Sequence, residues 1–145
     1  MDSGLSPHPE LAPHRILHFH DFVYGRTTPY DDYSHGTHVT GIIGAKQIGI
    51  APECNLIALK ILDHHGNCSI ELFIEAIHWL LTHQYEYNIR IVNMSVGSNP
   101  SISRTEQILL NLWVSRLWEA GLIVCCSAGN NGPTRNTITA PGNCE

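Results

Sequence analysis

The sequence predicts an α/β fold in which helices cover both faces of a mostly parallel β-sheet. Segments with strand-like and helix-like patterns alternate along the 145 residues, in the order β-α-β-α-β-α-β. This alternation requires parallel strands that are joined by right-handed helical crossovers. Three predicted strands run directly into small or turn-forming residues, in the stretches DHHGNCS, SVGSNPS and SAGNNGP. Since sites in parallel sheets form at the carboxyl ends of strands, these stretches predict a functional rim.

The first four elements follow from their hydrophobic patterns. Residues 15–22, RILHFHDF, alternate apolar and polar side chains and predict a strand. Residues 35–46, HGTHVTGIIGAK, predict a short helix. Residues 55–62, NLIALKIL, form a continuous apolar run that is typical of a strand buried on both faces. Residues 69–84 carry apolar side chains at helical spacing, and Ser69 is the expected N-cap of this helix.

The remaining three elements complete the alternation. Residues 89–97, IRIVNMSVG, predict a strand that ends in small residues. Residues 103–121 predict a helix that begins with a capping box formed by Ser103 and Glu106 and ends at a glycine. Residues 122–132, LIVCCSAGNNG, predict a last buried strand that runs into a glycine-rich turn.

The composition argues against nucleic-acid and membrane partners. Binding to nucleic acid needs a Lys/Arg patch that neutralises phosphates, whereas this chain has a net charge of −5 and only 8 scattered Lys and Arg residues. No apolar run approaches the ~20 residues that span a bilayer. The start, MDSGLSPHPE, has neither the basic nor the apolar region of a signal peptide, so a cytoplasmic location is expected.

The cysteines do not form a disulfide pattern. Their number is five, which is odd, and Cys125 and Cys126 are adjacent in an apolar stretch. We therefore expect reduced, largely buried thiols in a cytosolic setting. No C-x-x-C occurs, which argues against a zinc ribbon.

Two histidines at the head of the predicted 35–46 helix raise the main functional question. His35 and His38 could be metal ligands, packing residues, or one catalytic histidine with a structural neighbour. Asp2, His35 and Asn130 would supply a carboxylate, an imidazole and an amide at the rim, which suggest orienting, base and oxyanion roles. Taken alone, Asp2 also fits an unordered chain end and Asn130 also fits a turn.

Two further histidine groups are incomplete as metal sites. His18 and His20 alternate on a strand and so share one face. His64, His65 and Cys68 form a second loose group. Neither group is a complete ligand set, so we expect no metal and no cofactor.

Five sequence motifs together resemble those of subtilisin-like serine peptidases. DSGLSPHPEL resembles the aspartate motif of this family, and SHGTHVTGIIGA resembles its histidine motif. GIAPECNLIALKIL is similar to the strand that follows the histidine helix, IVNMSVGS to the substrate-binding strand, and CCSAGNNGP to the oxyanion-asparagine segment. The motifs occur in the family's order over nearly the whole chain, so it is identified as a member with the family's three-layer α/β fold.

The resemblance implies a role for each of these segments. Asp2 and His35 would be the orienting aspartate and the general base, and the Asn130 amide would stabilise the oxyanion. His38 would then be a packing or hydrogen-bonding neighbour of His35. The substrate would be a polypeptide in extended conformation. The residues that the resemblance assigns to its cleft are Gly66, Asn67, Cys68, Ser95, Val96, Gly97, Ser98, Cys126, Ser127, Ala128 and Gly129.

The chain departs from the family pattern at the nucleophile. The family's serine lies in a G-T-S-M-A-type segment, and no such segment occurs among the 145 residues. The strand that normally precedes the aspartate is absent as well. Residues 1–145 are therefore expected to be the N-terminal and central portion of a peptidase domain, truncated at both ends. A missing N-terminus could carry a signal peptide, which would make the enzyme secreted.

The resulting expectation is a serine endopeptidase that uses an Asp-His-Ser triad whose serine lies beyond this chain, so that the chain alone is inactive. The alternative is a non-catalytic pseudopeptidase fragment with a peptide-binding or regulatory role. Calcium is common in the family, but no acidic loop that would supply its ligands is evident here.

Overall fold

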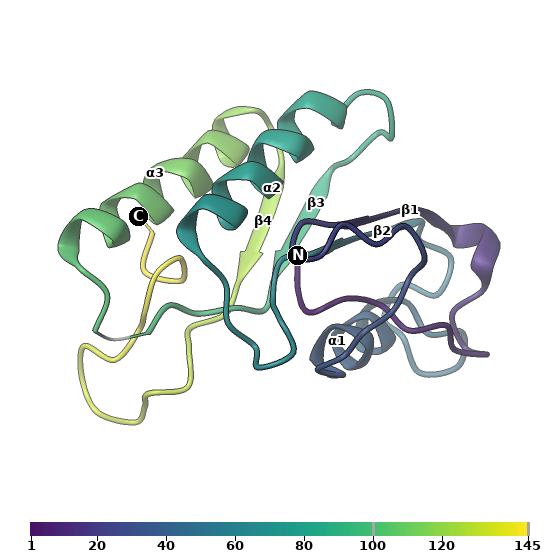
Figure 1. Ribbon diagram of the computed structural model, residues 1–145, viewed down its shortest axis with the longest axis horizontal. Coiled ribbons are helices and arrows are strands. Elements are labelled where there is room, and N and C mark those ends of the chain that lie inside the picture. Colours follow the sequence, from purple (N-terminus) through teal and green to yellow (C-terminus); the bar gives the residue numbers. More distant parts are fainter. Residues whose placement is uncertain (100, 145) are drawn as a thin grey trace. The chain divides into compact units, whose positions relative to one another are not determined.

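The computed structural model describes residues 1–99 and 101–144, and the chain forms two compact units, Met1–Leu72 and Phe73–Glu145 (Figure 1). Helix α2 begins at the end of the first unit and continues in the second. The elements, in chain order, are the 3-10 helix η1 (Pro13–Arg15), β1 (Ile16–Asp21), α1 (His35–Gly44), β2 (Leu56–Lys60), α2 (Ile70–His83), β3 (Ile91–Met94), α3 (Arg104–Glu119) and β4 (Ile123–Cys126).

In the first unit, β1 and β2 pair in parallel, in a register that places Asp21 opposite Lys60. Asp2 forms a parallel bridge to Lys60, so that the N-terminal segment also lies beside β2. Arg15, at the end of η1, is buried and donates to the carbonyl oxygen of Gly44, the last residue of α1, at 2.7 Å. A buried guanidinium thus satisfies an otherwise unpaired carbonyl at the C-terminus of α1.

In the second unit, β3 and β4 pair in parallel, from Ile91 opposite Ile123 to Met94 opposite Cys126. Helices α2 and α3 lie over one face of this strand pair (Figure 1). Their buried side chains recur at helical spacing, as the sequence patterns predicted. These side chains are Phe73, Ala76, Ile77 and Leu80 from α2 and Leu110, Val114 and Leu117 from α3.

The predicted helix ends are confirmed. Ser69 Oγ accepts a hydrogen bond from the Leu72 amide at 3.3 Å, as expected of an N-cap. Ser103 and Glu106 form the reciprocal capping box at the start of α3. After α3 the chain turns at Gly121, whose φ of +85° is a left-handed conformation that favours glycine.

All seven predicted elements occur, with the predicted type and order. The last two strands are shorter than predicted, because after Met94 and Cys126 the chain leaves the strand pair at small residues. The prediction that β4 is buried is wrong, since Ile123 is 54% exposed. Side chains alternate across a strand, and α2 and α3 lie over one face of β3 and β4.

The prediction of largely buried thiols is also wrong. All five cysteines are free, but Cys68 and Cys125 are exposed and the other three are partly exposed. Cys125 lies on the same alternating face of β4 as Ile123, whereas Cys68 lies in the loop before α2. An apolar sequence context therefore did not indicate which side of the strand a thiol occupies.

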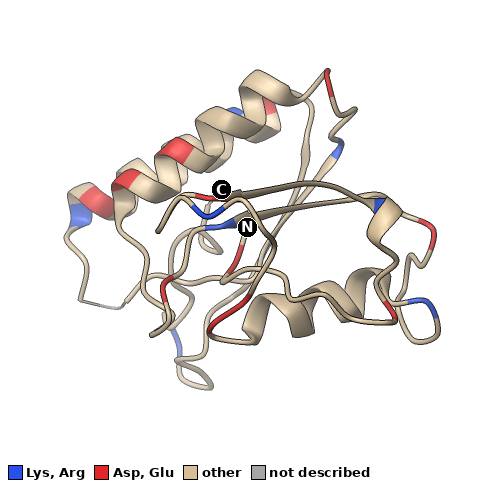
Figure 2. Ribbon diagram, turned by 45° about the vertical axis from the view of Figure 1, so that its right-hand side comes forward, with Lys and Arg blue, Asp and Glu red and all other residues tan. Residues whose placement is uncertain are grey.

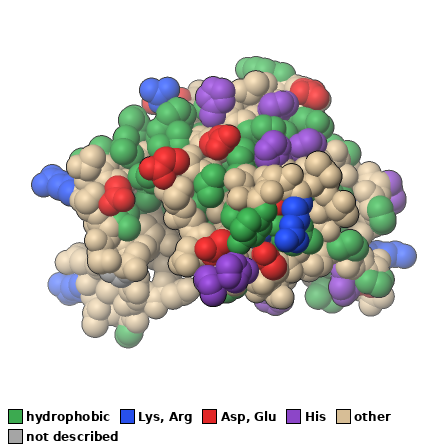
Figure 3. Space-filling view, in the orientation of Figure 1, with side chains coloured by type: hydrophobic (Ala, Val, Ile, Leu, Met, Phe, Trp, Pro, Cys, Tyr) green, Lys and Arg blue, Asp and Glu red, His purple; other side chains and the backbone are tan. Residues whose placement is uncertain are grey.

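Charged residues and histidines are dispersed over the fold. Lys and Arg residues lie scattered along the described part of the chain (Figure 2). Histidine side chains reach the surface at several places (Figure 3). Among the described residues, no group of three or more His, Cys, Asp or Glu side chains is arranged to hold a metal ion. Within residues 1–99 and 101–144, no helix is both long enough and apolar enough to cross a bilayer.

The capping box gives a test of this account of α3. Ser103→Ala should lower the free energy of unfolding by about 1 kcal/mol, because the first turn loses the acceptor of its N–H group. Chemical denaturation measures this change. Thr105→Ala is the matched control, since Thr105 is exposed in the same turn and its replacement should not destabilise the protein. Equal losses for the two variants would contradict a capping role for Ser103.

Candidate active site

Main-chain hydrogen bonds to β2 hold Asp2 in place. Its amide donates to the Leu59 carbonyl oxygen at 3.0 Å, and the Ile61 amide donates to the Asp2 carbonyl oxygen at 2.8 Å. Asp2 is only 8% exposed. The structure therefore places Asp2 in an ordered, strand-like segment and not in a free chain end.

The side chain of Asp2 meets His35, the first residue of α1. His35 Nδ1 lies 2.7 Å from Asp2 Oδ1, and the imidazole remains 41% exposed. An ionised carboxylate only accepts hydrogen bonds, so Nδ1 carries the proton in this contact. Nε2 of the neutral ring is then left with a lone pair, which is the arrangement that a general base requires.

The two oxygens of the Asp2 carboxylate are in different environments. Oδ1 accepts from His35 and also from the Ser3 amide at 2.7 Å. Oδ2 is buried and has no hydrogen-bond partner among the described residues. The carboxylate therefore meets His35 through the oxygen that the Ser3 amide also holds.

His38 has a different environment from the one expected. Its side chain is exposed, and none of the described residues forms a hydrogen bond with it. The expectation that His38 packs against or hydrogen-bonds to its surroundings is therefore wrong, because this part of α1 faces solvent. Of the two histidines in the motif, only His35 has a carboxylate partner.

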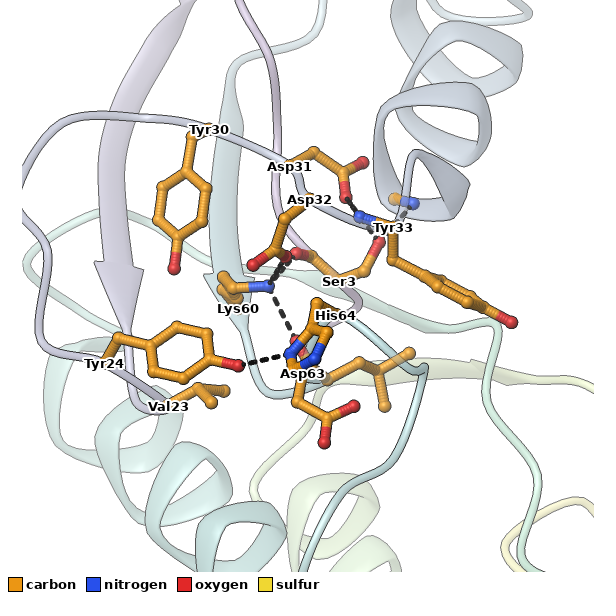
Figure 4. A network of polar contacts seen from close by, with 12 residues as sticks. Ser3, Val23, Tyr24, Tyr30, Asp31, Asp32, Tyr33, Lys60, Asp63 and His64 are labelled. Atoms are coloured by element: carbon orange, nitrogen blue, oxygen red, sulfur yellow. Dashed lines mark hydrogen bonds and ion pairs between the residues drawn. The ribbon is translucent and has the colours of Figure 1, made fainter.

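A buried lysine fixes the segment that carries Asp2 (Figure 4). Lys60 is fully buried at the end of β2, and its Nζ donates to the Ser3 carbonyl oxygen at 2.5 Å, to Asp32 Oδ1 at 2.6 Å and to the Leu62 carbonyl oxygen at 2.7 Å. These three acceptors satisfy all three protons of the ammonium group. Our sequence analysis missed this residue, although a lysine within the apolar run NLIALKIL was a visible signal.

The loop after β2 holds the first predicted cleft segment. Asp63 Oδ1 accepts from the amides of His65 and Asn67, each at 2.8 Å, and the hydrogen bond from Asn67 is the main reason that the pKa of Asp63 is lowered. Gly66 has a φ of +79°, and a Cβ there would collide with the Tyr33 ring. Gly66 thus has a local packing role, and its predicted approach to a peptide stays a prediction.

In the second unit, the two remaining segments that were predicted to line a cleft lie against each other. Ser127 Oγ donates to the Val96 carbonyl oxygen at 2.9 Å, which joins residues 95–98 to residues 126–129. The Ser127 amide donates to the Met94 carbonyl oxygen at 3.2 Å. Asn130 follows in an exposed loop and has no side-chain hydrogen bond within the described residues. Its amide is therefore available to a ligand.

A segment that our sequence analysis overlooked packs on these loops. The Ser98 amide donates to the Ala140 carbonyl oxygen at 2.7 Å. Thr139 Oγ1 lies 3.0 Å from the position that a Cβ on Gly97 would take. A side chain at position 97 would therefore press against Thr139. Such contacts between irregular segments leave no periodic pattern in the sequence.

Comparisons with known proteins agree on one family. The subtilase family profile matches residues 1–145. The chain is 36% identical to serine protease AprX of Bacillus subtilis (strain 168), covering 98% of this chain and 34% of that protein. It is 34% identical to the minor extracellular protease Epr of the same organism, covering 91% of this chain and 19% of Epr. The chain thus spans about a third or less of the length of these relatives.

Solved structures show the same likeness. The structure described as "S41 Psychrophilic Protease" superposes with a TM-score of 0.83 at 28% identity, over 98% of this chain and 48% of that chain. The predicted α/β fold with parallel strands is thereby confirmed as an incomplete subtilisin-like fold.

Lys60 gives a test of how the site is held. Lys60→Met should lower the free energy of unfolding by about 3 kcal/mol, because two buried carbonyl oxygens and Asp32 lose their donor. Denaturant titration measures this loss. The exposed Lys46 is the matched control, and Lys46→Met should change stability by less than about 0.5 kcal/mol. A Lys60→Met variant as stable as Lys46→Met would show that the buried ammonium is dispensable.

Proposed function

The chain belongs to the subtilase family, and we propose that it is the part of a serine endopeptidase that supplies the aspartate, the histidine and the oxyanion asparagine. The family match and the relatives, which are serine proteases by name, support the class of enzyme. The observation that carries the proposal is the 2.7 Å contact between His35 Nδ1 and Asp2 Oδ1.

His35 acts as base and then as acid in this proposal. Nε2 takes the proton of a serine hydroxyl while its oxygen attacks the peptide carbonyl carbon. Asp2 keeps the proton on Nδ1 and stabilises the imidazolium. His35 then gives the proton to the leaving amine as the C–N bond breaks, which leaves an acyl-enzyme. Water repeats the sequence with His35 again as base, and the second product is released with a carboxylate.

Asn130 stabilises negative charge in this proposal. Its side-chain N–H donates to the oxygen that becomes negative in the tetrahedral intermediate. The exposed position of Asn130 after β4 supports this role. The amide stabilises the transition state more than the bound substrate, because the negative charge develops only in the transition state.

The nucleophile lies outside residues 1–145 in this proposal, so that the chain alone is inactive. Ser127 donates its hydroxyl proton to Val96, and Ser95 accepts from Asn93 at 2.9 Å. Each hydroxyl has a structural partner, which supports a role in lining the cleft. The substrate is an extended polypeptide whose main chain pairs with loop segments at Gly66–Cys68 and Ser95–Gly97.

A secreted location fits this proposal better than the cytoplasmic one expected from the sequence. Epr is by name an extracellular protease, and it is 34% identical over 91% of this chain. Location can be tested by fractionating cells that express the protein.

The histidine assignment is tested in an enzyme that joins these 145 residues to a G-T-S-M-A-type serine segment. His35→Ala should lower kcat by several orders of magnitude, because the base is lost. His38→Ala is the matched control from the same helix, and its kcat should stay within about twofold, since an exposed side chain without a partner is removed. Steady-state hydrolysis of one peptide substrate measures both. If His38→Ala were inactive at unchanged stability, the two assignments would be reversed.

The oxyanion role is tested separately. Asn130→Ala should lower kcat about 100-fold with little change in KM, because the lost hydrogen bond acts mainly in the transition state. Asn131→Ala is the control, since Asn131 is the adjacent exposed asparagine. A change in KM alone for Asn130→Ala would remove Asn130 from the oxyanion site.

A further inference from the structure

Asp31 lies four residues before His35 and accepts five hydrogen bonds. Its Oδ1 accepts from Ser3 Oγ at 2.8 Å and from the amides of Tyr33 and Ser34 at 3.1 and 2.8 Å. Its Oδ2 accepts from the amide and the hydroxyl of Thr37 at 2.8 and 2.7 Å. Figure 4 shows Asp31 beside Ser3, at the start of the helix that begins with His35. These bonds leave the carboxylate little capacity for another ligand.

Two hydroxyl groups extend these bonds to the opposite segment. Ser3 Oγ donates to Asp31 and accepts from the Gly36 amide at 2.9 Å. Thr37 Oγ1 donates to Asp31 and accepts from the Ser6 amide at 2.9 Å. Because a carboxylate cannot donate, Asp31 fixes the direction of both hydroxyl protons. Each hydroxyl then presents its lone pairs to a backbone amide of the other segment.

The Ser3 bridge lies next to the contact between Asp2 and His35. Ser3 directly follows Asp2, and Gly36 directly follows His35. The two backbones approach so closely here that a Cβ on Gly36 would collide with the Gly4 carbonyl oxygen. Gly4 itself has a φ of +134°, a conformation that glycine adopts without strain. The two bridges from Asp31 thus hold the N-terminal segment against the start of α1, at a place where Gly4 and Gly36 permit the close approach of the two backbones.

Asp31 stays ionised in this position. Burial by itself would raise the pKa of the carboxyl, but the hydrogen bonds from Thr37, Ser3 and Tyr33 outweigh burial and lower the pKa. The neighbouring Asp32 has a different role, since it pairs with Lys60. Asp31 is therefore the carboxylate that joins the N-terminal segment to α1.

We propose that Asp31, acting through Ser3 and Thr37, is a positioning residue that sets the distance between Asp2 and His35. It does not touch the reacting atoms. The effect of Asp31 on catalysis rests on the proposed function, because the position of His35 affects the reaction only if His35 is the base. The claim that Asp31 sets the distance between Asp2 and His35 does not depend on that function.

The structural part is tested in the 145-residue chain by measuring solvent exchange of the His35 Nδ1 proton by NMR. Asp31→Asn and Thr37→Val should each make this exchange about tenfold faster or more, the factor expected when a hydrogen bond to a charged group is lost. Thr37→Ser keeps the hydroxyl, so the His35 Nδ1 proton of this variant should exchange at the same rate as in the unchanged chain. Thr40→Val makes the same substitution one turn further along α1 and is the second control.

Exchange of the Ser6 amide proton shows whether the Thr37 bridge is broken. Thr37→Val keeps the shape of the side chain, so it decides the question if Asp31→Asn does not fold. If Thr37→Val frees the Ser6 amide but leaves the His35 proton exchanging as in Thr40→Val, the proposal is overturned. Faster exchange of the His35 Nδ1 proton in Thr37→Val than in Thr40→Val would support it.

The catalytic part is tested in the enzyme joined to its serine segment. Thr37→Val should lower kcat about 10- to 100-fold with KM within about twofold, because a displaced base loses reactivity while the cleft is unchanged. Thr37→Ser should restore kcat. An unchanged kcat would refute positioning by Asp31, whereas full activity of His35→Ala would refute the proposed function itself.

Discussion

The hydrogen bond between His35 and Asp2 is the interaction on which the functional account depends. At 2.7 Å it fixes the proton on Nδ1 and leaves Nε2 as the basic atom. The two residues are 33 positions apart, so the fold must hold the N-terminal segment against the start of α1. Without that contact, the same imidazole would be an ordinary surface histidine.

Two charged groups hold the N-terminal segment from different sides. Lys60 binds the Ser3 carbonyl oxygen from within the unit, and Asp31 binds the Ser3 hydroxyl near α1. Both groups are satisfied by several partners, which offsets much of the cost of removing a charge from water. The segment that carries Asp2 is therefore fixed by its neighbours on both sides, as a preorganised site requires.

The sequence predicted features whose cause is local. Helical stripes, the Ser103 capping box and the turn at Gly121 depend on residues within a few positions of each other, and each is present. Asp2 and His35 were identified from a family motif. Lys60 and Asp31 were missed, because Ser3, the partner through which each holds the N-terminal segment, lies 57 and 28 residues away and only the fold brings them together. The exposure of His38 and Cys125 also depends on which face a neighbouring element covers.

The most direct measurement of the central claim is fluorophosphonate labelling of the chain joined to a G-T-S-M-A-type serine segment. Such reagents react with a serine only when a neighbouring base activates it. The account predicts one label per molecule, on the serine of the added segment, and loss of the label when His35 is replaced by alanine. Labelling that persists without His35, or that falls on a serine of residues 1–145, would contradict the account.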